Sequence, residues 1–149
     1  MRVISKHKMW SPRKIGKNKK MNATSSLFGD QLLNAVFANF EVMKFKTTES
    51  ELMSIFFEML SKPKFRPLAA QYPFDLDGPE PKSKALADAF DSLQQSRLIG
   101  RLNPDLVVYE IKEAMSLRYK KFIKRKLNGT QDLIKELAEA VQARVKVVG

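Results

Sequence analysis

Residues 83–111, SKALADAFDSLQQSRLIGRLNPDLVVYEI, carry the pattern that decides the fold. Ser83 is a favourable helix N-cap, and apolar residues recur at helical spacing after it as far as Leu93. Two β-prone runs, 97–102 and 106–111, then flank the turn sequence Asn103-Pro104-Asp105. The stretch predicts a helix followed by an antiparallel hairpin near 97–111.

Two more helices are predicted before this stretch. The first covers about 25–44, and its apolar stripe consists of Leu32, Leu33, Val36, Phe37, Phe40 and Met43. The second begins at Thr48, which forms a capping-box pattern with Glu51, and Pro63 ends it. Residues 61–82 hold five of the seven prolines, interleaved with Phe65, Leu68, Tyr72, Phe74 and Leu76. A loop this long and aromatic is expected to wrap the core.

Two helices are predicted after the hairpin. The fourth runs from about 112 to 127 and stops at Asn128-Gly129, and Thr130 caps the fifth. Residues 145–148 fit either a helix end or a strand. The expected fold class is therefore mainly α (α+β), with about five helices and one short hairpin. Residues 1–24 form a basic extended arm, and 25–149 form a single helical domain.

The order of three helices and a hairpin over about 25–111 resembles that of a winged-helix domain. In that fold the third helix reads the DNA major groove. Here the third helix carries Asp88 and Asp91, and carboxylates are repelled by phosphates. The loop before it is also longer than a tight helix-turn-helix requires. We therefore do not expect this helix to read DNA in the usual way.

Composition excludes several classes of protein. The chain has 149 residues, no cysteine and one histidine, so disulfide scaffolds and thiolate metal sites are excluded. No apolar run approaches the roughly 20 residues that span a bilayer. His7 stands alone in the basic arm, and the acidic turn 75–80 lacks the ligand spacing of a calcium loop. We expect no enzymatic activity, no metal and no cofactor.

The net charge of +11 is unevenly distributed along the chain. Residues 1–20 contain eight basic residues and no acidic one, and residues 112–128 contain seven basic residues and one acidic one. Residues 21–111 contain more acidic than basic residues. Two short segments therefore carry the positive charge, and the core between them is mildly acidic.

The arm has the composition of a segment that follows a nucleic-acid backbone. Its candidate contact residues are Arg2, Lys6, Lys8, Trp10, Arg13, Lys14, Lys17, Lys19 and Lys20. Trp10 is suited to stacking on a base, while the cations neutralise phosphates. The arm resembles ribosomal protein extensions in composition. A solubilising tail or a nuclear-type basic address remains the alternative.

The fourth helix separates an apolar face from a cationic face. A regular helix places Ile111, Met115, Tyr119 and Phe122 on one stripe that docks on the core. The opposite face holds Leu117 and the candidate contact residues Arg118, Lys120, Lys121, Lys124 and Arg125. A cationic face suits a polyanion because each neutralised phosphate releases counterions. A solvated lysine-rich surface is the alternative.

These features favour a non-enzymatic nucleic-acid-binding protein, either a ribonucleoprotein component or a small DNA-associated regulator. RNA and DNA are equally compatible with such phosphate contacts. The alternative is a protein-interaction subunit of a larger complex, with Phe65, Tyr72, Phe74 and the acidic third helix as its surface. In that case the basic segments meet an acidic partner. Peripheral membrane binding ranks lower because the helix's apolar face is needed for the core. The expected location is cytoplasmic or another intracellular compartment.

Overall fold

The computed structural model describes residues 29–103, 108–127 and 129–147. The α-helices of this part are α2 (Gly29–Ala38), α3 (Glu49–Leu60), α4 (Arg66–Ala69), α5 (Lys84–Gln95), α6 (Glu113–Arg118) and α7 (Gln131–Arg144). The strands are β2 (Lys44–Lys46), β3 (Ile99–Asn103), β4 (Val108–Ile111) and β5 (Lys146–Val147). A π-helical turn (Tyr119–Ile123) and a 3-10 turn (Lys124–Lys126) continue α6, and a 3-10 turn (Pro63–Phe65) precedes α4. The mainly α (α+β) fold class is confirmed.

The four strands form one antiparallel sheet in the order β3-β4-β2-β5. The predicted hairpin is β3 and β4, although its turn at 104–107 lies outside the described residues. β2 was not predicted, and β5 lies within 145–148, which the sequence left open between a helix end and a strand. β2 has only three residues, and β5 has two, so neither offers a run long enough to recognise from sequence.

The first predicted helix was too long, because α2 ends at Ala38 rather than at residue 44. The side chain of Asn39 donates a 2.8 Å hydrogen bond to the Ala35 carbonyl and closes the last turn. The chain then turns into β2, which alternates exposed, buried and exposed residues. Met43 is consequently half exposed instead of facing the core. The predicted start of this helix at 25–28 lies outside the described residues.

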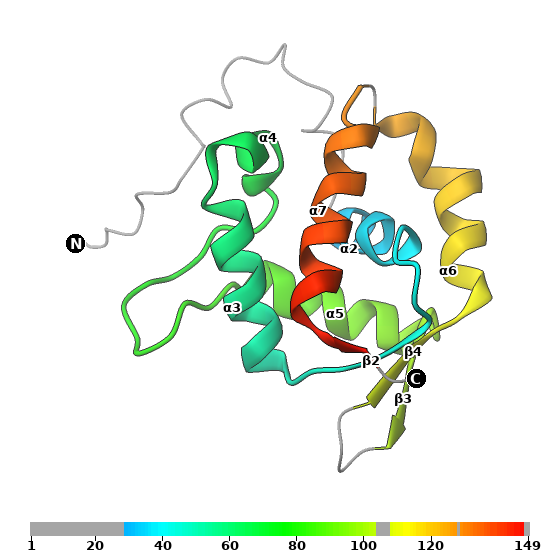
Figure 1. Ribbon diagram of the computed structural model, residues 1–149, viewed down its shortest axis with the longest axis horizontal. Helices are drawn as coiled ribbons and strands as arrows, with labels where there is room; N and C mark the ends of the chain where they lie inside the picture. Colours follow the sequence, from blue (N-terminus) through cyan, green and yellow to red (C-terminus); the bar gives the residue numbers. More distant parts are fainter. Residues whose placement is uncertain (1–28, 104–107, 128, 148–149) are drawn as a thin grey trace.

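The core gathers around α2, which lies behind α7 in Figure 1. α3 and α6 lie on opposite sides of α7 in this view, and the sheet lies at one end of the molecule. Phe37 of α2 stacks on Phe45 of β2, with ring centroids 5.4 Å apart, and Tyr109 of β4 continues the aromatic cluster. Phe90 of α5 packs on Tyr109 at 5.1 Å. Aromatic packing thus joins the helices to the inner face of the sheet.

Two predicted helix starts have the expected chemistry, and one does not. Thr48 and Glu51 form a complete capping box at α3, and the Ser83 hydroxyl accepts from the Leu86 N–H at α5. Thr130 lies before α7, but its side chain makes no capping bond there. Its hydroxyl donates instead to the Leu127 carbonyl at the end of the preceding segment. Thr130 has φ −100° and ψ 5°, whereas Thr48 and Ser83 have the extended backbone that is typical of an N-cap.

The proline-rich segment 61–82 wraps the core, as predicted. Phe65, Tyr72 and Phe74 are buried, so these aromatic rings are not an accessible working surface. The segment also contains α4, which the sequence did not predict. The Tyr72 hydroxyl donates to the Gly29 carbonyl, and Gly29 packs so closely on this ring that a Cβ would lie 3.1 Å from it. The segment therefore holds the first turn of α2.

The order that suggested a winged-helix domain, three helices and then a hairpin, is present in α2, α3, α5 and β3-β4. β2 adds a strand between the first two helices, and α4 adds a short helix before the third. Asp88 and Asp91 both lie on the exposed side of α5. In the part of the chain that is described, none of the helices has the length and apolar character needed to cross a bilayer.

Candidate nucleic-acid interface

The basic segment 113–126 packs on α2 through residues four apart. Met115, Tyr119 and Ile123 are buried, and Leu127 follows at the same interval with no exposed surface. In a regular α-helix, four residues advance the chain by about 40° more than one full turn. Three such steps would carry the buried stripe a third of the way around the helix. The segment must therefore widen to keep one face on the core.

The π-helical turn supplies this widening. The Lys124 N–H donates to the Tyr119 carbonyl, five residues earlier, instead of to the residue four earlier. The wider turn directs Ile123 inward and Phe122 outward, where 63% of Phe122 is exposed. The predicted position of Phe122 on the buried stripe was wrong, because that prediction assumed 3.6 residues per turn throughout.

Arg118, a predicted contact residue, is half-buried and makes contacts within the protein. Its guanidinium donates to the Asn34 side-chain oxygen at 3.3 Å and lies 3.5 Å from an Asp30 carboxylate oxygen. Asn34 is fully buried, and its amide donates to the Met115 carbonyl at 3.1 Å. This network fixes α6 on α2 immediately before the π-helical turn. Arg118 therefore has a structural role, whatever else it contacts.

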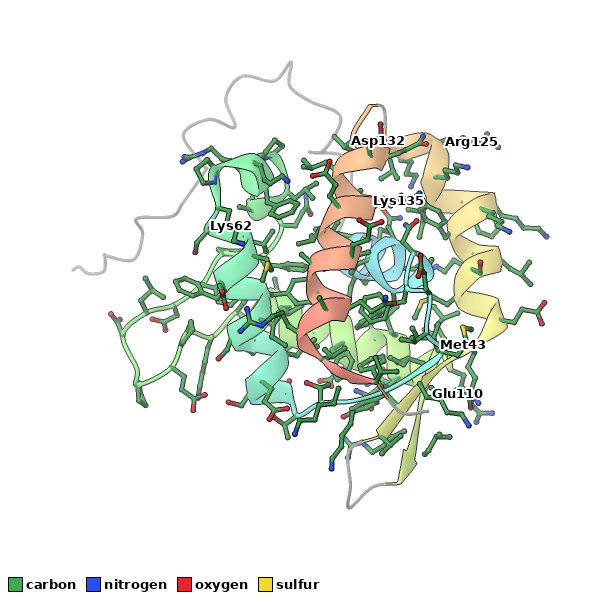
Figure 2. The ribbon with its side chains drawn as sticks, in the orientation of Figure 1. Met43, Lys62, Glu110, Arg125, Asp132 and Lys135 are labelled. Carbon is green, nitrogen blue, oxygen red and sulfur yellow. The ribbon has the colours of Figure 1, made fainter. Side chains whose placement is uncertain are left out.

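The other cations of this segment are exposed and lie within seven consecutive residues. We call them the cationic ridge, which consists of Lys120, Lys121, Lys124, Arg125 and Lys126. None of them forms an ion pair with a residue in the described ranges. Figure 2 places Arg125 near one end of this helical segment and Glu110 just beyond the other. Lys126 was counted in the basic segment but was not predicted as a contact residue.

Exposed apolar residues accompany the ridge. Leu117 is about half exposed, with 51% of its surface accessible, and lies one turn before Lys121 on the outward side. Phe122 lies between Lys121 and Lys124 in the sequence, within the π-helical turn. The surface thus combines cations with one large aromatic ring, a composition typical of interfaces that contact both phosphates and bases.

A second group of cations lies on the outer face of the sheet and was missed from sequence. Lys44 and Lys46 of β2 are exposed on one face, and Lys146 of β5 lies directly opposite Lys46. Lys112 lies over Gly100 of β3, where a Cβ would approach its Cε to 3.1 Å. The alternation in Lys44-Phe45-Lys46 is the only sequence signal for this face, and it spans too few residues to identify a strand.

Glu110 is the acidic group among these lysines. Its carboxylate accepts a 2.9 Å hydrogen bond from Lys112 Nζ, and it lies opposite Lys44 in the sheet. The hydrogen bond and the charge of Lys112 lower the pKa of Glu110, and the charge of Lys44 lowers it further. Glu110 offsets one lysine, so this face keeps a positive charge.

Another group of acidic side chains lines a cavity away from the basic segment. This cavity of 540 Å³ between the N-terminal ends of α3 and α5 is lined by Glu49, Asp75 and Glu80 together with Lys82 and Lys84. Two of its three carboxylates have local partners: Ser50 donates to Glu80 at 2.7 Å, and the Asp77 N–H donates to Asp75 at 2.9 Å. Within the described ranges, histidine and carboxylate side chains form no group of three able to hold a metal.

The predicted contact residues of the arm, with Trp10 among them, and His7 lie outside the described residues. Among the predicted contacts that are described, the structure brings together Lys120, Lys121, Lys124 and Arg125 and turns Arg118 inward. Comparisons with protein-family models, with curated proteins and with solved structures found no match for this chain.

Proposed function

We propose that this protein binds nucleic acid, without enzymatic activity, through the cationic ridge and the basic arm. The observation that carries the proposal is the exposure of five cations within seven consecutive residues that form no ion pair in the described part of the chain. Like charges repel, so such a cluster destabilises the free protein and is stabilised by an anionic partner. A regular polyanion is the partner that compensates all five charges.

Two features of the segment support this proposal. The buried stripe holds the ridge on α2, so binding does not require a helix to form first. The segment also contains a π-helical turn, which is rare and is frequently found at functional sites. Phosphate contacts of this kind position a nucleic acid without reading its sequence. The protein would act as a ribonucleoprotein component or as a DNA-associated regulator.

The proposal predicts binding that depends strongly on salt. If four ridge cations each contact one phosphate of a single strand, affinity falls about 50-fold between about 50 and about 200 mM salt. Electrophoretic mobility shift with RNA and with duplex DNA across this range measures the slope. The variant Lys120/Lys121/Lys124→Glu should abolish the ridge contribution and flatten the slope. A chain without residues 1–20 measures the contribution of the arm.

A charge-matched control separates the ridge from the overall charge of the molecule. The variant Lys62/Lys64/Arg66→Glu makes the same change in charge around α4, away from the ridge. It removes the exposed ion pair of Lys64 with Glu136, which is worth at most about 1 kcal/mol, and the contact of the Lys64 ammonium with the Phe65 ring. Equal losses of affinity in the two variants, or affinity that does not change with salt, would contradict a specific role for the ridge.

A protein partner with acidic and apolar side chains is the second candidate. The exposure of Leu117 beside the ridge favours it, because an aliphatic side chain contributes more to a protein interface than to a phosphate contact. Leu117→Ser distinguishes the two candidates. This substitution should weaken the binding of an acidic protein partner and leave the salt-dependent binding of nucleic acid unchanged.

A further inference from the structure

Phe122 is an exposed aromatic residue within the cationic ridge, and phosphate binding alone does not require it. The ring is 63% exposed, although Ile123 next to it is completely buried. A regular helix would place Phe122 on the buried stripe, so the π-helical turn exchanges a large aromatic ring for a smaller aliphatic side chain in the core. Because the ring is exposed, the folded protein lacks the hydrophobic stabilisation that burial of the ring would provide.

The surroundings of Phe122 identify the chemistry of its partner. Phe122 lies between Lys121 and Lys124 in the sequence, and all three residues are exposed on this short segment, so a ligand that covers the ring also comes close to cations. The basic arm of this chain is a poor occupant, because residues 1–20 contain eight basic residues and no acidic one. The occupant must combine regular negative charge with a flat apolar face.

We propose that Phe122 stacks on an unpaired base of a single-stranded nucleic acid whose phosphates lie along the cationic ridge. This inference rests on the proposed function and specifies its ligand. In a duplex, each base is paired and stacked on its neighbours, so its face is not available to a side chain. Unpaired bases stack on exposed aromatic rings whatever their sequence, and cations beside the ring hold the backbone. The protein should therefore prefer single strands to duplexes.

The test compares three probes of equal length: oligo(dT), an abasic oligonucleotide with the same number of phosphates, and a DNA duplex. Phe122→Ala and Phe122→Leu should weaken binding of oligo(dT) about 5- to 150-fold and leave binding of the abasic probe unchanged. Phe122→Trp should retain the affinity for oligo(dT). In a Trp10→Phe background, the new tryptophan should be quenched by oligo(dT) and not by the abasic probe. Because Phe122 is exposed, these variants should keep the wild-type melting temperature.

The outcomes separate this inference from the proposed function. Base stacking is overturned if Phe122→Ala weakens binding of all three probes equally or of none of them. It is also overturned if Phe122→Leu binds oligo(dT) as tightly as the wild type does. Base stacking is also overturned, in favour of a protein partner, if Phe122→Leu loses binding to an acidic peptide but keeps its binding to oligo(dT). The proposed function fails separately, if Lys120/Lys121/Lys124→Glu binds all three probes as the wild type does.

Discussion

α5 and the basic segment 113–126 both pack one face on the core, but they do so with different geometries. α5 is regular, and its buried residues Leu86, Ala89, Phe90 and Leu93 follow the 3.6-residue period. The basic segment passes from α-helix through a π-helical turn to a 3-10 turn, and its buried residues are four apart. The outward side of α5 carries Asp88 and Asp91, whereas that of the basic segment carries the cationic ridge.

The comparison shows that a helix's exposed face depends on its backbone geometry as well as on its sequence. In α5 the exposed side chains are those that a regular helix predicts. In the basic segment the π-helical turn exposes Phe122 and buries Ile123. The helix that a winged-helix resemblance would assign to DNA is thus acidic and regular, and the irregular helix carries the surface suited to a polyanion.

The largest predicted effect comes from deleting Asp91, an exposed charged residue of the regular helix α5. Deletion of Asp91 in α5 places Leu93 two residues after Phe90, which rotates its side chain by about 100° away from the core. Loss of one buried leucine costs about 2–5 kcal/mol of the free energy of unfolding. Chemical denaturation of the deletion variant measures this loss.

Deletion of Lys121 should have a much smaller effect. It shortens the interval from Tyr119 to Ile123 from four residues to three, so the buried residues then follow a regular α-helical stripe. We expect the free energy of unfolding to change by less than about 1 kcal/mol, within the usual range of surface changes. A loss as large as that of the Asp91 deletion would show that the π-helical turn is required for packing.

The two helices are also held by different polar groups. Asn34→Ala removes the bond to the Met115 carbonyl and leaves Arg118 with Asp30 alone, at a cost of about 1–3 kcal/mol because both partners are poorly hydrated. Ser83→Ala removes the N-cap of α5 and costs about 1 kcal/mol. Thermal denaturation of both variants compares them. An equal or larger loss in Ser83→Ala would contradict the special role of Asn34.

Much of the fold was predictable from sequence because the ends of most helices are determined by residues close to them in the chain. The capping box at Thr48 and the N-cap at Ser83 depend on residues three apart, and both are present in the structure. The errors arise where a distant residue decides the local structure. β2 exists because Lys44-Phe45-Lys46 pairs with β4, more than sixty residues later in the chain. The bond of Asn34 to Met115 likewise joins residues 81 positions apart, beyond the reach of any local pattern.

The candidate site was predictable to the same extent. The charge of the basic segment was evident from sequence, because charge does not depend on backbone geometry. Phe122 was assigned to the core because the π-helical turn is not evident from sequence. Arg118 was assigned to the exposed face because its partners Asn34 and Asp30 lie more than eighty residues earlier in the chain. The sheet lysines Lys44, Lys46 and Lys146 come together only through strand pairing, which the sequence did not reveal.

The smallest predicted effect concerns the ion pairs at the start of each helix. Lys112 and Glu110 precede α6, and Lys84 and Asp88 lie in the first turns of α5; each pair has an N–O distance of 2.9 Å. The pKa of Glu110 is lowered, so its ionised form stabilises the folded protein above the ordinary carboxyl pKa. That stabilisation is lost as the pH falls through the lowered pKa. Glu110→Gln should therefore lose less stability than the wild type between about pH 5 and about pH 3.

Asp88→Asn is the control for this comparison. Its pair is more exposed, with 87% and 63% of the two side chains accessible, so the substitution should have little effect on stability at any pH in this range. Glu110→Gln should also raise the affinity for nucleic acid slightly at neutral pH, because it removes the carboxylate that offsets Lys112 on the lysine-rich outer face of the sheet. If Asp88→Asn instead raises the affinity for nucleic acid as much as Glu110→Gln does, α5 and the basic segment contribute equally to the electrostatic attraction of the nucleic acid. The assignment of binding to the basic segment rather than to α5 would then be wrong.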